Sequence, residues 1–162
     1  MKTWLFIVLS CLCADLVSAQ TEVPPYKKTK AIPAFELELA DHSTFTQATI
    51  KKNVPLIIMF FSPGCEHCQH QTEAMIKRMN DLKKYQIVMA TFQPVEEVAE
   101  FNKKYLLSKY PNITVGRDGK YALPPFFEIH NFPYLAFYNK SGQFLSAFEG
   151  NMDVDTILKR FK

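Results

Sequence analysis

Hydrophobic positions along the chain follow two spacings, one typical of strands and the other of helices. Strict alternation over residues 35–39 predicts a half-exposed strand, and the continuous apolar run over residues 56–61 predicts a strand buried on both faces. Residues 65–83 contain no Gly or Pro, and their apolar residues recur at helical spacing, which predicts a long amphipathic helix. By the same criteria, further strands are expected at 86–92, 112–115, 134–138 and 143–148, and further helices at 44–52, 94–109, within 119–130 and from 151 or 153 onwards.

The order of these elements predicts the architecture. Strands that alternate with helices indicate an α/β fold with a mostly parallel central sheet, right-handed crossovers and helices on both faces. The last two strands are joined by a turn at residues 139–142, which predicts an antiparallel C-terminal hairpin. No internal repeat or linker divides the chain, so we place a single domain at residues 33–162.

Composition narrows the class of protein. Hydrophobic residues make up 48% of the 162 positions and charged residues 22%, which excludes a disordered tail, a collagen and a coiled coil. The formal net charge of +3 is too small to indicate a nucleic-acid-binding protein, which usually carries a concentrated basic patch. We therefore expect no nucleic-acid partner and no cofactor, and we expect a monomer.

The first twenty residues are typical of an export signal. Lys2 precedes a ten-residue apolar run at 4–13, and the small residues 17–19 suit cleavage after Ala19, which predicts a signal peptide at 1–19. The run is shorter than the roughly 20 residues of a membrane-spanning helix. We expect a periplasmic or secreted protein with a flexible N-terminal arm at residues 20–32. A less favoured alternative is a lipoprotein anchored at Cys11, because the sequence before this residue partly matches a lipobox.

Removal of residues 1–19 leaves two of the four cysteines, and these form a C-x-x-C motif. Cys65 and Cys68 lie where a buried strand is followed by a long helix. The unpaired N–H groups and the partial positive charge of the helix N-terminus stabilise a thiolate there, so Cys65 is predicted to be the nucleophile. A spacing of three places Cys68 one turn along the same helix face, close enough to form a disulfide. The motif therefore predicts a redox-active pair.

Other roles for these cysteines are less consistent with the sequence. Zinc sites normally have four Cys or His ligands. His67 lies between the two cysteines and would have to point to their side, and the chain has no second C-x-x-C motif. We therefore predict no metal site, while a copper-handling role and a purely structural disulfide stay open as alternatives.

These motifs together resemble the thioredoxin superfamily. The matching features are the buried strand before the C-x-x-C motif, a proline before a hairpin strand at residues 132–135, and a C-terminal helix. Cys68 and Pro133 are 65 positions apart, which leaves room for more than one βαβ unit. With the predicted export, this excess resembles the TlpA/ResA-like branch of periplasmic thioredoxins, and the resemblance covers about residues 33–162.

The resemblance implies a substrate-binding loop. Pro133 corresponds to the family's cis-proline, which lies beside the two sulfurs. Phe132 would then present its backbone N–H and C=O groups to an extended substrate. The sequence departs from the thioredoxin pattern at two nearby positions, because Met59 replaces a buried Asp and Gly64 replaces an aromatic residue.

The two residues between the cysteines are candidates for tuning the redox couple. His67 stands where thioredoxin has a proline, and by donating a hydrogen bond to the Cys65 thiolate it would make the disulfide more oxidising. Glu66 acts oppositely, because its negative charge repels the thiolate. The sum of the two effects does not follow from the sequence.

These observations predict a thiol–disulfide oxidoreductase that acts on exported protein disulfides or dithiols. The family resemblance favours a reductant, with a membrane-bound protein as the candidate electron donor. A disulfide oxidase or isomerase is the main alternative, since His67 favours it. A redox-inactive adaptor or metal-binding module is an alternative of a different class. A peroxide-reducing enzyme is not favoured, because the peroxiredoxin surroundings of the active cysteine, with a nearby Thr, are absent.

Overall fold

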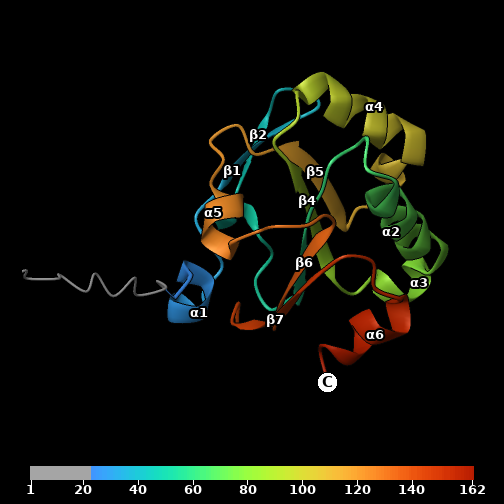
Figure 1. Cartoon of the computed structure of the whole chain (residues 1–162). Coiled ribbons are helices and arrows are strands. Elements are labelled where there is room, and N and C mark those ends of the chain that lie inside the picture. Colours follow the sequence, from blue (N-terminus) through green and yellow to red (C-terminus); the bar gives the residue numbers. More distant parts are fainter. Residues whose placement is uncertain (1–22) are drawn as a thin grey trace, which may run out of the picture.

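Seven strands of the computed structural model form one sheet, in the order β2-β1-β5-β4-β3-β6-β7 (Figure 1). The structure describes residues 23–162, so the predicted signal peptide at 1–19 and the alternative anchor Cys11 lie outside the described residues. The strands are β1 Glu36–Leu39, β2 Thr44–Thr46, β3 Leu56–Phe60, β4 Gln86–Thr91, β5 Ile113–Arg117, β6 Tyr134–Tyr138 and β7 Phe144–Glu149. The helices are α1 Pro25–Thr29, α2 Glu66–Lys77, α3 Met79–Leu82, α4 Val95–Tyr105, α5 Leu123–Phe127 and α6 Val154–Lys159, with short 3-10 helices at Gln47–Thr49 and Leu107–Lys109.

The three central strands carry the parallel part of the sheet. β3 pairs in parallel with β4, and β4 with β5, whereas the other four pairings are antiparallel. The predicted α/β fold and the C-terminal hairpin β6–β7 are therefore present, but the sheet as a whole is mixed rather than mostly parallel. The difference arises at β1, which pairs antiparallel with both β2 and β5. Four residues link β1 to β2, enough for a hairpin and too few for a parallel crossover.

The helix predicted at residues 44–52 is wrong. This segment forms strand β2 and a 3-10 helix, and β2 pairs with β1 so that Phe45 lies opposite Leu37. The Phe45 ring also stacks on Phe35, with ring centroids 6.2 Å apart. Threonines 44 and 46 suit a strand, and the contacts with β1 decide the conformation of a segment whose local pattern also fits a helix.

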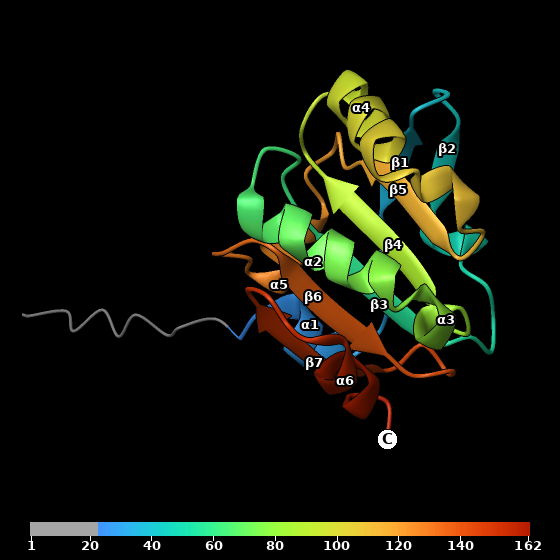
Figure 2. The ribbon, with the colours of Figure 1, turned by 90° about the vertical axis from the view of Figure 1, so that its right-hand side faces the viewer.

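Helices cover both faces of the sheet, as predicted. The alternating side chains of β3 contribute to two separate cores, since Met59 belongs to one buried cluster and Phe60 to the other. The Met59 core contains residues of α2, α3, α4 and α6, and the Phe60 core contains residues of α5. Figures 1 and 2 show α2, α4 and α6 on one side of the sheet and α1 and α5 on the other.

The long helix predicted at residues 65–83 is interrupted at Arg78, which separates α2 from α3. Arg78 has φ −113° and ψ 24°, outside the helical region, and its guanidinium bonds to Asp81 and to Asp155 at the start of α6. The chain changes direction at this break, and Met79 and Leu82 of α3 are buried. The break thus coincides with a tertiary ion pair between Arg78 and Asp155.

The predicted flexible arm at residues 20–32 differs from the structure over the part that is described. Residues 25–29 form α1, and the Tyr26 ring lies 5.9 Å from the Phe127 ring and 5.1 Å from the Phe144 ring. Ala31 forms a β-bridge with Gln143. This segment is therefore packed against the domain. Within residues 23–162, no helix is long and apolar enough to cross a bilayer.

Candidate active site

The two cysteines lie at the carboxyl end of β3, where a tight turn leads into α2. The Phe61 N–H donates to the Ala90 carbonyl and extends the pairing with β4, and the chain then turns so that the Cys65 N–H donates to the Ser62 carbonyl. Cys65 is the N-cap residue of α2, and its carbonyl accepts the Gln69 N–H. The sequence prediction for the position of this motif is therefore confirmed by the structure.

The two sulfurs have different surroundings. Both thiols are free; Cys65 is partly exposed, and Cys68 is fully buried in the core that contains Met59 and Leu135. Burial raises the pKa of the Cys68 thiol to about 12, and a hydrogen bond with Cys65 and the charge of Cys65 act in the same direction. A backbone hydrogen bond from Ser62 opposes this rise. Only Cys65 is thus placed to meet a partner, while Cys68 stays protonated at neutral pH.

The predicted substrate loop lies at the same end of the sheet. The Phe132–Pro133 peptide bond is cis, in agreement with the prediction. Pro133 immediately precedes β6, and Tyr134 of that strand lies opposite Phe60 at the end of β3. The Phe132 ring lies 5.8 Å from the Phe60 ring, and like Cys65 it packs against the edge of the Met59 core. The fold thus brings Phe132 and Pro133 to the same end of the sheet as the two cysteines.

Glu149, at the end of β7, holds the segment before the cis-proline, and the sequence analysis did not identify it. One carboxylate oxygen accepts the His130 N–H at 2.8 Å, and the other accepts the Asn131 side-chain amide at 2.8 Å. Burial alone would raise the pKa of Glu149, but the hydrogen bonds from His130 and Asn131 outweigh it and lower the pKa. The next residue, Gly150, donates its N–H to the Pro133 carbonyl at 2.7 Å. The loop is therefore fixed on both sides of Phe132.

The residues between the cysteines are exposed, and the structure gives one of them an unexpected partner. The His67 ring Nδ1 lies 3.1 Å from the Asn151 side-chain oxygen, and the Asn151 amide donates to the His67 carbonyl at 2.6 Å. His67 is thus hydrogen-bonded to the segment between β7 and α6, and no hydrogen bond joins it to Cys65 among the described residues. Glu66 occupies the first turn of α2, where its negative charge suits the helix dipole.

A buried glutamine, also missed by the sequence analysis, anchors the active-site helix. The Gln71 side chain is 1% exposed; it accepts the Met152 N–H at 2.7 Å and donates to the Met152 carbonyl at 3.0 Å. Thr72 donates its hydroxyl to the Cys68 carbonyl at 2.8 Å. The polar residues at 67 and 71, one turn apart on α2, were the available signal for this contact. The contacts of His67 and Gln71 with Asn151 and Met152 hold α2, which carries both sulfurs, against the segment before α6.

The surroundings of Cys68 are apolar. Met59, which stands where thioredoxins have a buried Asp, is fully buried in the same core as Cys68. His70, which also has a side chain that can bind metal ions, is exposed. Within residues 23–162, no group of three or more His, Cys, Asp or Glu side chains is arranged to hold a metal ion.

Comparisons with known proteins give one family and one fold. The family model described as the AhpC/TSA family matches residues 29–153. Protein disulfide isomerase-like 1-1 of Arabidopsis thaliana is 28% identical over 120 residues, which are 72% of this chain and 22% of that protein. The chain thus spans about a fifth of the length of this relative.

Similar solved structures support the architecture. A Neisseria meningitidis protein described as a thioredoxin is 26% identical, with a TM-score of 0.65 over 80% of this chain and 85% of that one. A secreted Mycobacterium tuberculosis disulfide oxidoreductase homologous to E. coli DsbE is 18% identical, with a TM-score of 0.65 over 78% and 92%. StoA from Bacillus subtilis is 17% identical, with a TM-score of 0.60 over 80% and 98%. These likenesses confirm the predicted thioredoxin fold.

Proposed function

The chain belongs to the AhpC/TSA family, and from its site we propose that it is an exported thiol–disulfide oxidoreductase that reduces disulfides of exported proteins. The enzyme class is that of its thioredoxin-like relatives and agrees with the sequence prediction. One observation carries the proposal. A partly exposed Cys65 is the N-cap of α2 and a buried Cys68 follows one turn later, at the same end of the sheet as the cis-proline loop.

In the first step of the reaction, the Cys65 thiolate attacks one sulfur of the substrate disulfide. A mixed disulfide forms between Cys65 and the substrate, and the second substrate sulfur leaves as a thiolate that takes a proton. Cys68 then loses its proton and attacks the Cys65 sulfur, which releases the first substrate thiol. The substrate gains two electrons and two protons, and the chain is left with a Cys65–Cys68 disulfide.

The surroundings of Cys68 keep this thiol unreactive before the mixed disulfide forms. The raised pKa of Cys68 keeps this thiol protonated, and no buried acid stands at Met59 to accept its proton. The backbone hydrogen bond from Ser62 favours the Cys68 thiolate once the mixed disulfide has formed. Phe132, held by the Glu149 contacts with the preceding residues, offers its backbone to the substrate chain.

A turnover assay tests the enzymatic role. We expect the protein to catalyse the reduction of insulin disulfides by dithiothreitol, and the Cys65→Ser variant to lose this activity because the attacking sulfur is gone. A Cys68→Ser variant expressed in the native envelope should accumulate mixed disulfides, whose partners identify the substrates. If the intact protein shows no turnover, the chain acts as an adaptor; turnover of hydrogen peroxide without disulfide reduction points to a peroxidase.

The direction of electron flow is decided by the reduction potential. Equilibration with glutathione buffers and alkylation of the free thiols measures the Cys65–Cys68 couple. A value near or below about −270 mV supports a reductant served by a membrane-bound donor, whereas a value above about −200 mV supports an isomerase or an oxidase. The second outcome is the alternative favoured by the Arabidopsis relative, whose name is that of a disulfide isomerase.

Export is tested on the protein recovered from its native host. Intact-mass analysis should show a chain that begins at or near Gln20. A diacylglyceryl mass on Cys11 would establish the lipoprotein alternative instead.

A further inference from the structure

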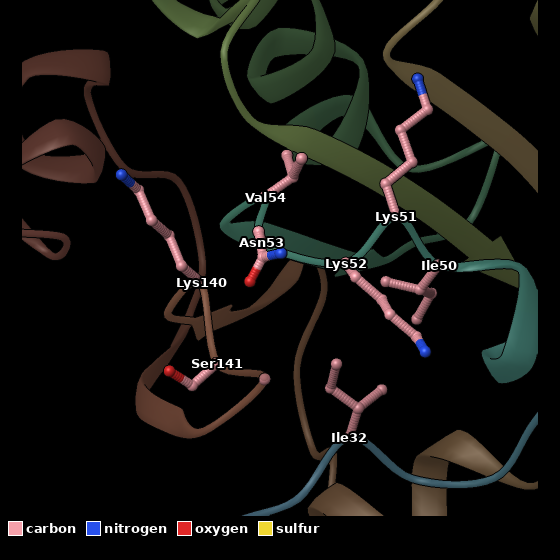
Figure 3. Close-up of a pocket in the computed structure, with 9 residues that line it drawn as sticks. Ile32, Ile50, Lys51, Lys52, Asn53, Val54, Lys140 and Ser141 are labelled. Atoms are coloured by element: carbon pink, nitrogen blue, oxygen red, sulfur yellow. The ribbon is translucent and has the colours of Figure 1, made fainter.

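Three adjoining hollows lie at the end of the sheet opposite the cysteines. The first is lined by Ile32, residues 50–54 and the β6–β7 turn at 140–142 (Figure 3). The second includes residues 139–141 and 160–162, and the third includes residues 80, 81 and 83–85 with Phe161 and Lys162. Because the first two share Lys140 and Ser141, and the last two share Phe161 and Lys162, the hollows form one continuous surface, which we call the basic end.

The sheet register places the basic end far from Cys65. Residues 50–54 precede β3, whereas the C-x-x-C motif follows it. Leu56, the first residue of β3, pairs with Tyr138 just before the β6–β7 turn and with Gln86 just after residues 80–85. The five residues of β3 span about 17 Å, so the two sites lie at opposite ends of the same strand.

The basic end carries a strong excess of positive charge. Seven cationic side chains line it, namely Lys51, Lys52, Lys83, Lys84, Lys140, Arg160 and Lys162. The only acidic side chain in its lining is Asp81, which is paired with Arg78. Among residues 23–162, no carboxylate forms an ion pair with any of the seven. The rest of the chain has 12 basic and 15 acidic side chains, so the mild net charge of +3 hides a polarised molecule.

The arrangement of these cations suits a broad anionic surface rather than a small ion. In Figure 3 the side-chain amines of Lys51, Lys52 and Lys140 extend away from one another around the first hollow and do not converge on its centre. The seven cations spread over three hollows, and Leu145, a lining residue of the second, is 41% exposed. A planar surface with distributed negative charge can contact all of them at once.

The aromatic residues of the basic end argue against single-stranded nucleic acid, which needs free ring faces for base stacking. Tyr85 is 5% exposed, and its ring packs on Phe161 with centroids 4.5 Å apart. Phe161 also contacts Phe137 of β6 edge to face. Both rings are therefore used within the fold.

We propose that the basic end docks the protein on the surface of an anionic lipid bilayer. Lysine and arginine side chains near such a surface are attracted to its lipid headgroups, and the attraction is screened by salt. Because Cys65 lies at the opposite end of β3, the docked protein presents its dithiol away from the bilayer, towards protein substrates. This inference does not depend on the direction of electron flow.

Vesicle co-sedimentation tests the proposal with the exported protein as purified. Vesicles of phosphatidylcholine with added phosphatidylglycerol should bind the protein, and binding should be lost between about 0.05 M and about 0.5 M NaCl. Pure phosphatidylcholine vesicles should bind weakly, and they measure any contribution of the residues that precede Val23 in the exported protein. The triple variant Lys51→Glu/Lys52→Glu/Lys140→Glu should bind anionic vesicles at least about a hundredfold more weakly, at about fivefold per lysine.

A matched triple variant controls for total charge. Lys103→Glu/Lys104→Glu/Lys120→Glu makes the same change in net charge at residues outside the basic end and should keep most of the binding. Retained insulin reduction by both variants shows that they are folded. Equal binding to neutral and anionic vesicles, or equal losses in the two triple variants, would overturn the proposal. So would salt-sensitive binding of an oligonucleotide or an acidic protein in the absence of vesicle binding.

Discussion

Replacing Cys65 with serine leaves Cys68 as the only thiol within residues 23–162, so the reactivity of the buried sulfur can be measured alone. Burial is the largest cause of its raised pKa, and burial persists in this variant. With a pKa of about 12, roughly one Cys68 thiol in 10⁵ is ionised at pH 7, against about 3% for an ordinary thiol with a pKa of about 8.5. Because the thiolate is the reactive form, alkylation of Cys68 should be slower than that of an ordinary thiol by up to about 3,000-fold, and by less where the lost contribution of Cys65 to the raised pKa counts.

Iodoacetamide labelling followed by peptide mapping measures this rate. The folded Cys65→Ser variant is compared with the same variant in guanidinium chloride, where Cys68 has the reactivity of an unfolded thiol, and with folded Cys68→Ser. The Cys68 rate should rise about tenfold per pH unit from pH 7 to 10 without reaching a plateau, since its pKa lies above this range. Folded Cys68 that reacts within tenfold of the unfolded reference would refute the argument from burial.

The same raised pKa has a consequence for stability. Folding keeps Cys68 protonated, so the associated stability is present below the unfolded pKa of about 8.5 and is lost as the pH rises towards the folded value of about 12. The urea midpoint of the reduced protein should therefore fall more steeply above about pH 9 than that of Cys68→Ala. Parallel curves for the two proteins would contradict the raised pKa.

Five further variants, one of them a control, test other parts of the site and fold. Glu66→Gln removes a negative charge beside the Cys65 thiolate and should raise the reduction potential by tens of millivolts, on a scale of about 30 mV per tenfold in glutathione equilibrium; an unchanged potential would make this side chain a bystander. Glu149→Gln should raise the KM for a peptide disulfide without changing the alkylation rate of Cys65, because it weakens the hold on the loop before the cis-proline; equal effects on both would indicate a general loss of structure. Gln71→Leu leaves two buried backbone groups without partners and should lower the free energy of unfolding by about 1–3 kcal/mol in urea titrations. Gly116→Ala places a Cβ 2.8 Å from a side-chain carbon of β1 and should lower the melting temperature through a cost of about 1–3 kcal/mol, whereas Gly64→Ala, with nothing within 4 Å of its Cβ, should change little.

Much of the candidate active site was predictable because its signals are local. The apolar run of β3, the C-x-x-C motif and the uninterrupted amphipathic segment after it place a thiol pair at a strand–helix junction. The resemblance to thioredoxins then implied the role of Pro133, and the cis peptide bond agrees with it. The contacts that position the site could not be predicted in this way. His67 and Asn151 are 84 residues apart, and nothing in the local pattern of either residue specifies the other.

The class of the fold, the positions of the buried central strands and the place of the C-x-x-C pair follow from short segments of the sequence, because the spacing of hydrophobic residues and the start of a helix are local properties. Three other features depend on contacts with distant parts of the chain: residues 44–52 form a strand and a 3-10 helix instead of a longer helix, α2 ends at Lys77, and residues 25–32 pack against the domain. The fold also brings Glu149 to the loop before Pro133 and places seven cations at one end of the sheet. Those cations come from four separate segments, and their charges act together only because the fold brings the segments to one surface.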